Sequence, residues 1–137
     1  MHAYLADSAA NLPAYLAYLG TMVAMLFGFA WIYLRVTPYH ELDLIRRGNK
    51  AAALSYIGAI TGFAIAMKTV AAGTTALADL AMWGVIALVT QLAVFFFVSR
   101  LLRDLREGIE SDRVSYGILL GGISLATGLL NAGALTY

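Results

Sequence analysis

A few polar side chains interrupt the long apolar stretches of this chain, and they are its first candidates for a functional role. Lys68 is the only basic residue inside such a stretch, and Asp79 begins the next one, while Gln91 and Asn131 lie deeper in later stretches. Groups of this kind in lipid either mark an ion pathway or make structural contacts. We favour the structural interpretation, in which Lys68 snorkels to the interface or pairs with Asp79 and the amides bond between helices. A polar pathway is the alternative.

Catalytic patterns are missing from the sequence. There is no arrangement of nucleophile and base, no glycine-rich phosphate loop, and no pair of carboxylates within an apolar stretch. Zero cysteines exclude disulfides, thiolate metal sites and thiol catalysis. His40, Glu41 and Asp43 form the one metal-like group, and a total of two histidines makes it a weak candidate. We therefore expect no enzymatic activity, no metal and no cofactor.

The composition is that of a membrane protein. Of the 137 residues, 61% are hydrophobic and 12% are charged, whereas a soluble domain has about 45–50% apolar and about 25% charged residues. A net charge of +1 offers no basic surface for nucleic acid. Four apolar stretches reach the ~20 residues that cross a bilayer: residues 13–34, 51–72, 77–99 and 114–136. Their continuity favours helices over a barrel, so we expect an all-α integral membrane four-helix bundle forming a single transmembrane domain over residues 1–137.

The distribution of charge predicts the orientation. Eight of the nine basic residues lie in the loops that follow the first and third stretches: Arg35, Arg46, Arg47, Lys50, Arg100, Arg103, Arg106 and Arg113. The positive-inside rule places these loops in the cytoplasm and both termini outside. The segment before Leu12 has no Lys or Arg, so we expect no cleaved signal peptide.

Several loop residues have predicted contacts. Glu41 and Asp43 are expected to pair with Arg46, Arg47 or lipid headgroups. Asn49 is predicted to cap the second long helix, and the pair at 111–112 the fourth. The remaining loop cations, together with these residues, are candidates for contact with anionic lipid or a partner protein: Lys50, Arg103, Arg106 and Arg113.

A shift of 63 positions aligns the second half of the chain with the first. Glu41 then meets Asp104, Asn49-Lys50 meets Asp112-Arg113, and Gly58 meets Gly121. This agreement favours a duplication with halves at residues 13–72 and 77–136. Both halves enter from the same side, so the fold would be two parallel helix-hairpin repeats.

Charges at a spacing of four follow the third stretch. Arg100 and Asp104, Arg103 and Glu107, and Arg106 and Glu110 make three such pairs, which share one face of a helix. We therefore predict that the third helix continues to Glu110. At ~1.5 Å per residue it would be ~50 Å long and would project from the membrane.

Small residues recur at a spacing of four in three of the stretches. Such faces let helix backbones approach closely in lipid. They comprise Gly20, Ala24 and Gly28; Gly58 and Gly62; Gly117 and Gly121; and Ser124 and Gly128. We expect them to pack the four-helix unit, with packing between subunits as the alternative. Four spans cannot enclose a conduit alone, so a pore would require oligomerisation.

Residues 41–62 carry a more specific pattern, in which an acidic residue precedes Gly-Asn, small residues open a helix and spaced glycines follow. The chain thereby resembles the YjfL-like family of small bacterial inner-membrane proteins, filed as domain of unknown function 350. The matching positions are Glu41, Gly48, Asn49, Ala51, Ala52, Gly58 and Gly62. In the second half the family pattern often has Asn where this chain has Asp112. The resemblance implies an inner-membrane location, four helices in two repeats and association with envelope-stress proteins of the phage-shock type; it implies no activity.

These observations predict a non-enzymatic inner-membrane protein that assembles with itself or with a peripheral membrane-stress protein on the cytoplasmic side. The alternative is a subunit of an oligomeric channel or small-solute transporter. That reading would place Lys68, Gln91 and Asn131 along a conduit between subunits.

Overall fold

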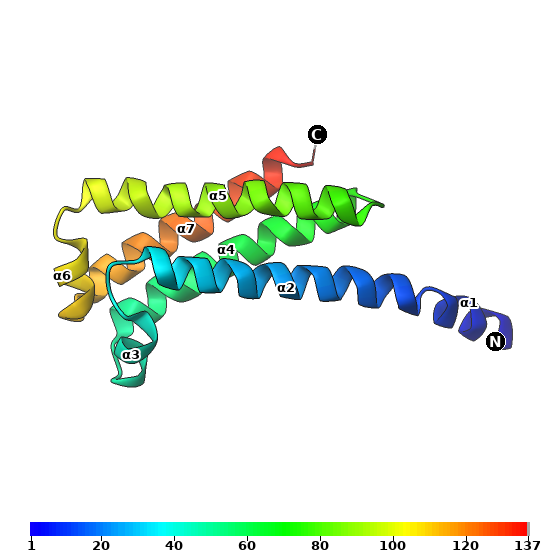
Figure 1. The fold of residues 1–137 in the computed structure, drawn as a ribbon, viewed down its shortest axis with the longest axis horizontal. Coiled ribbons are helices and arrows are strands. Elements are labelled where there is room, and N and C mark those ends of the chain that lie inside the picture. Colours follow the sequence, from blue (N-terminus) through cyan, green and yellow to red (C-terminus); the bar gives the residue numbers. More distant parts are fainter. Residues whose placement is uncertain (137) are drawn as a thin grey trace.

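The chain folds entirely into helices and turns over the described residues, 1–136, of a computed structural model (Figure 1). The helices are α1 (His2–Ala10), α2 (Leu12–Val36), α3 (Glu41–Arg46), α4 (Lys50–Gly73), α5 (Leu77–Leu101), α6 (Leu105–Glu110) and α7 (Val114–Ala134). Four segments are long and apolar enough to cross a membrane: the stretch His2–Val36, α4, α5 and α7. The predicted all-helical fold is confirmed, and it contains four candidate membrane-spanning segments.

Two helices, α4 and α7, form the centre of the fold, and they run side by side in the same direction. Along α7, Gly117 lies against Ala51, Gly121 against Leu54, and Gly128 against Gly62. A Cβ atom added at any of the five glycines assigned to packing would collide with the backbone of the opposite helix: Gly58, Gly62, Gly117, Gly121 and Gly128. The two backbones therefore touch directly, as small residues allow in lipid.

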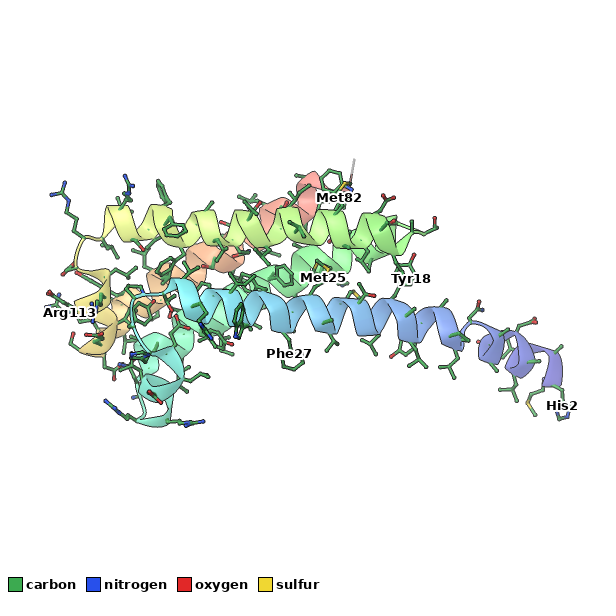
Figure 2. All side chains as sticks on the ribbon, in the orientation of Figure 1. His2, Tyr18, Met25, Phe27, Met82 and Arg113 are labelled. Carbon is green, nitrogen blue, oxygen red and sulfur yellow. The ribbon has the colours of Figure 1, made fainter. Side chains whose placement is uncertain are left out.

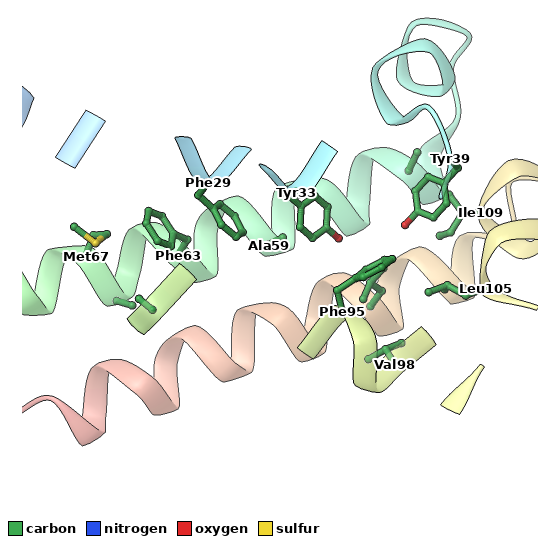
Figure 3. Close-up of a cluster of buried hydrophobic side chains, with 14 of the residues drawn as sticks. Phe29, Tyr33, Tyr39, Ala59, Phe63, Met67, Phe95, Val98, Leu105 and Ile109 are labelled. Atoms are coloured by element: carbon green, nitrogen blue, oxygen red, sulfur yellow. The ribbon is translucent and has the colours of Figure 1, made fainter. Parts of the chain in front are cut away.

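The other two long helices cover this pair unequally. α5 packs on both helices through a buried face that includes Leu80, Ala87 and Phe95. α2 buries only Phe29 and Tyr33, both in the half nearest α3. The Phe29 ring stacks on Phe63 at 4.6 Å between centroids (Figure 3). The other half of α2 packs more loosely, with the Tyr18 hydroxyl donating to the Thr74 carbonyl at 3.4 Å. Only α1 and the start of α2 extend beyond the bundle (Figure 1), where lipid is their natural solvent.

The predicted continuous helix over residues 77–110 is wrong. α5 ends at Leu101, and α6 is a separate short helix. The reason is the apolar face of α6, where Leu105, Gly108 and Ile109 are buried. A straight extension would have carried Leu105 and Ile109 into water. The chain instead turns after Leu101 and folds this face against the start of α7 and α4.

The charge pairing in this segment differs accordingly. Arg106 binds Glu110 at 3.1 Å as predicted, but the other two pairs at a spacing of four do not form. Asp104 instead accepts from the Tyr116 hydroxyl at 2.9 Å and pairs with Arg113 at 3.4 Å. The turn at residues 102–104 removes the helical register that those two predicted pairs required.

Candidate functional site

The most polar part of the interior lies where α2 ends, α3 begins and α4 starts. Pro38 cannot continue a helix, and α2 ends at Val36 just before it. The chain then reverses and buries Thr37, Tyr39 and Glu41 beneath the end of the bundle. Ser55, on the first turns of α4, is fully buried beside them. Three consecutive elements thus converge on one enclosed group of oxygen atoms.

Glu41 is the central member of this group. Its side chain is 1% exposed, and neither carboxyl oxygen has a hydrogen-bond partner. The buried hydroxyls of Tyr33 and Tyr39 are also unpartnered, and their oxygen ends point toward one another in Figure 3. Within residues 1–136, no basic side chain lies within 4.0 Å of the carboxylate. A buried charge without a partner is strongly unfavourable, so the geometry favours a neutral carboxyl.

The pKa values of Glu41 and Tyr39, which lie between the membrane-spanning helices, reflect this burial. Burial raises the pKa of Glu41 to about 8, although the nearby Thr37 and Tyr39 hydroxyls lower it in part. Burial, reinforced by the Glu41 carboxylate, also raises the pKa of Tyr39. Glu41 is therefore an acid that can hold a proton at neutral pH.

The predicted pairing of Glu41 with Arg46, Arg47 or lipid headgroups is wrong. The two arginines are exposed at the far end of α3 and make no ion pair with any described residue, while Glu41 faces inward. Aromatic residues at helix ends usually indicate an interfacial belt. The rule led us to assign these tyrosines to the membrane interface. The pattern that indicates a buried polar group is Tyr33, Tyr39 and Glu41 around a helix-ending proline.

Two reciprocal contacts tie the start of α4 to the α6–α7 turn. The Asn49 side chain accepts from the Ala52 N–H at 2.8 Å, which confirms the predicted cap, and it donates to the Ile109 carbonyl at 2.7 Å. Asp112 accepts from the N–H groups of Lys50 and Ala51 at 2.8 and 2.9 Å. A carboxylate there also meets the positive end of the α4 dipole.

The prediction that residues 111–112 cap α7 is therefore wrong. The backbone of Asp112 is left-handed, with φ at 59°, and its carboxylate bonds to the first N–H groups of α4. Arg113 occupies the position before α7, and its side chain makes no capping bond.

The polar residues of the long helices do not come together. Lys68 is exposed and forms no ion pair with Asp79, which accepts instead from Thr74 at 3.5 Å. The short turn between α4 and α5 draws Asp79 to this neighbour. Gln91 is buried and donates to the Ser124 carbonyl at 3.1 Å, leaving its own carbonyl oxygen unpartnered. The Asn131 amide nitrogen is also unpartnered.

Basic side chains gather at the end of the molecule that holds α3 and α6 (Figure 2). Arg113 and Arg106 engage carboxylates. Six further cations are exposed and form no ion pair within residues 1–136: Arg35, Arg46, Arg47, Lys50, Arg100 and Arg103. This end therefore presents a cationic surface beside the buried Glu41.

The chain matches a family model over residues 7–135, and the description of that family is Domain of Unknown Function (DUF350). It is similar to the UPF0719 inner membrane protein YjfL of Escherichia coli K12 and to the protein of the same name in Escherichia coli O157:H7. Each is 36% identical over 127 residues, which cover 93% of this chain and 96% of the relative. No solved structure matches the chain significantly.

Proposed function

The chain belongs to the DUF350 family, and on that premise we propose that this integral inner-membrane protein is a non-enzymatic component that assembles with itself. Assembly would use the face of α2 that the bundle leaves open. The cationic end would then be displayed in several copies to anionic lipid or to a peripheral membrane-stress protein. A role in membrane maintenance is the function that fits such an arrangement.

The observation that carries this proposal is the contrast between two sets of glycines. Those of α4 and α7 contact the opposite backbone, whereas Gly20 and Gly28 on α2 have no atom within 4 Å of an added Cβ. Ala24 lies between them on the same exposed face. Figure 2 shows Met25 directed into the bundle and Phe27 directed away from it. The small-residue face of α2 is therefore free to receive the same face of a second copy.

We expect Gly20→Leu combined with Gly28→Leu to abolish self-association in the membrane. Two leucines would hold the backbones apart at the contact that small residues permit. Subunit counting by single-molecule photobleaching in supported bilayers measures this directly. The matched control is Gly122→Leu, at an α7 glycine that likewise has open space around it. Unchanged association in the double variant, or equal loss in the control, would contradict assembly through α2.

The proposed orientation places α3 and α6 in the cytoplasm and both termini outside. It is supported by the gathering of basic residues at the α3–α6 end. Because the chain has no cysteine, single cysteines report position cleanly. A cysteine replacing Ser8 should react with an impermeant maleimide in intact cells, and one replacing Ser111 should react only after lysis. The opposite labelling pattern would invert the topology.

The two-repeat organisation is also part of this proposal. Gly58 and Gly121 are 63 positions apart and touch at the centre of the α4–α7 contact. Asn49 and Asp112 are related by the same shift, and both connect the start of α4 with the α6–α7 turn. A duplication of a parallel helix hairpin accounts for both pairs.

Each exposed cation at the α3–α6 end would add ~1 kcal/mol to binding of an anionic surface.

A channel or transporter subunit is the second candidate. It is favoured by the unpartnered amide atoms of Gln91, inside the bundle, and of Asn131, since an amide without a hydrogen-bond partner can bind a polar solute. Ion flux into liposomes that Gln91→Leu abolishes would support this function over assembly alone.

A further inference from the structure

We propose that the Glu41 carboxyl, enclosed by Tyr33, Tyr39 and Thr37, is a proton-binding site that exchanges with the aqueous phase at the α3–α6 end. This site is independent of the α2 face used in the proposed assembly. It lies on the buried side of α2, next to Tyr33.

The surroundings of the carboxyl select a proton as its partner. α2 contributes Tyr33, the α2–α3 connection contributes Tyr39, and α4 contributes Tyr56. None of these groups carries a positive charge, and no ion pair reaches the carboxylate from any described element. An added proton removes the uncompensated charge. It also makes the carboxyl a donor as well as an acceptor, so that it can donate to a tyrosine hydroxyl oxygen, which the carboxylate cannot do.

A groove brings the aqueous phase close to the site. It has a volume of about 480 Å³, and Thr37, Tyr39 and His40 are among the residues that line it. Thr37 and Tyr39 belong to both this groove and the immediate surroundings of Glu41. Their hydroxyls can accept and donate in turn, which lets a proton pass from water in the groove to a carboxyl oxygen and back.

The uncommon acidity of the group agrees with this assignment. Burial raises the pKa of Glu41 to about 8, so the site changes its occupancy near neutral pH. A carboxyl that stayed ionised or stayed neutral throughout the physiological pH range would not exchange a proton in response to the pH of the aqueous phase.

Infrared difference spectroscopy of the full chain in lipid nanodiscs tests the proposal. The C=O band of a protonated carboxyl should be present at neutral pH and should disappear with a midpoint near the pKa of Glu41, about 8. Glu41→Gln should remove this band. Asp43→Asn, at an exposed carboxyl on the same short helix, should leave it intact.

Three results would overturn the proposal. One is a spectrum without a protonated carboxyl band at neutral pH, and another is a band that persists in Glu41→Gln. The third is a midpoint that moves with sodium or potassium concentration at constant ionic strength, because the site would then take a metal cation. Glu41→Gln has the shape of the protonated residue, and its helical circular dichroism and thermal midpoint would show that loss of the band is not loss of fold.

Discussion

Gly121→Ala is expected to lower the free energy of unfolding by about 1–3 kcal/mol, the usual cost of forcing extra volume into a packed interior. The new Cβ would overlap the carbonyl oxygen of Leu54. A backbone oxygen cannot rotate away as a side chain can, so α4 and α7 must separate. The contacts of Gly58 and Gly117 along the same line would loosen with it. Unfolding by SDS in mixed micelles, followed by circular dichroism, measures the loss.

The adjacent glycine provides the control. Gly122 is exposed, and nothing lies within 4 Å of an added Cβ. Gly122→Ala should leave stability unchanged or raise it by up to about 1 kcal/mol, because alanine is the better helix former. Equal effects at positions 121 and 122 would show that helix propensity, and not contact between α4 and α7, determines the result.

Stability should fall as pH rises from about 5.5 to 7.5, by about 3 kcal/mol over that interval. The pKa of Glu41 in the folded chain is about 8, above its ordinary value of 4.5. Between these values the folded state binds more protons than the unfolded state, so raising the pH favours unfolding. The slope is about 1.4 kcal/mol per pH unit inside the window and disappears above the folded pKa. Thermal unfolding in detergent micelles at a series of pH values measures it.

Glu41→Gln removes the titrating group and should flatten this profile. The variant should be more stable than the natural chain at the alkaline end, since the amide carries no charge to bury. Asp43→Asn should retain the slope. A profile for the natural chain that is flat or rises with pH through the same interval would show that Glu41 is ionised inside the fold.

The apolar pattern was sufficient to predict the four spans and the all-helical fold. Hydrophobic length determines which segments cross the bilayer, and the glycine spacing identified faces that lie between α4 and α7. These features depend on residues close together in the chain. The Asn49 cap is local in the same sense, since its acceptor bond reaches only to Ala52.

The features that could not be predicted depend on tertiary contact. Asp112 is of a residue type that commonly caps the helix that follows it, yet it bonds to Lys50, 62 residues earlier in the chain. Glu41 stands among arginines in the sequence, but the reversal at Pro38 turns it inward toward Tyr33 and Tyr39. Charge spacing likewise predicted a continuous third helix. It contains no information on whether burying Leu105 and Ile109 stabilises the fold more than interrupting the helix destabilises it.

The cap that Asp112 places on α4 has a consequence for biosynthesis. When the first hairpin enters the bilayer ahead of α7, the leading N–H groups of α4 lack the Asp112 acceptor until the α6–α7 turn folds against them. The glycine face of α4 also has no packing partner until α7 is inserted. The first hairpin is thus an unfinished intermediate that matures only when the last helix is inserted. Quality control in the membrane could distinguish truncated chains from complete ones at this single turn.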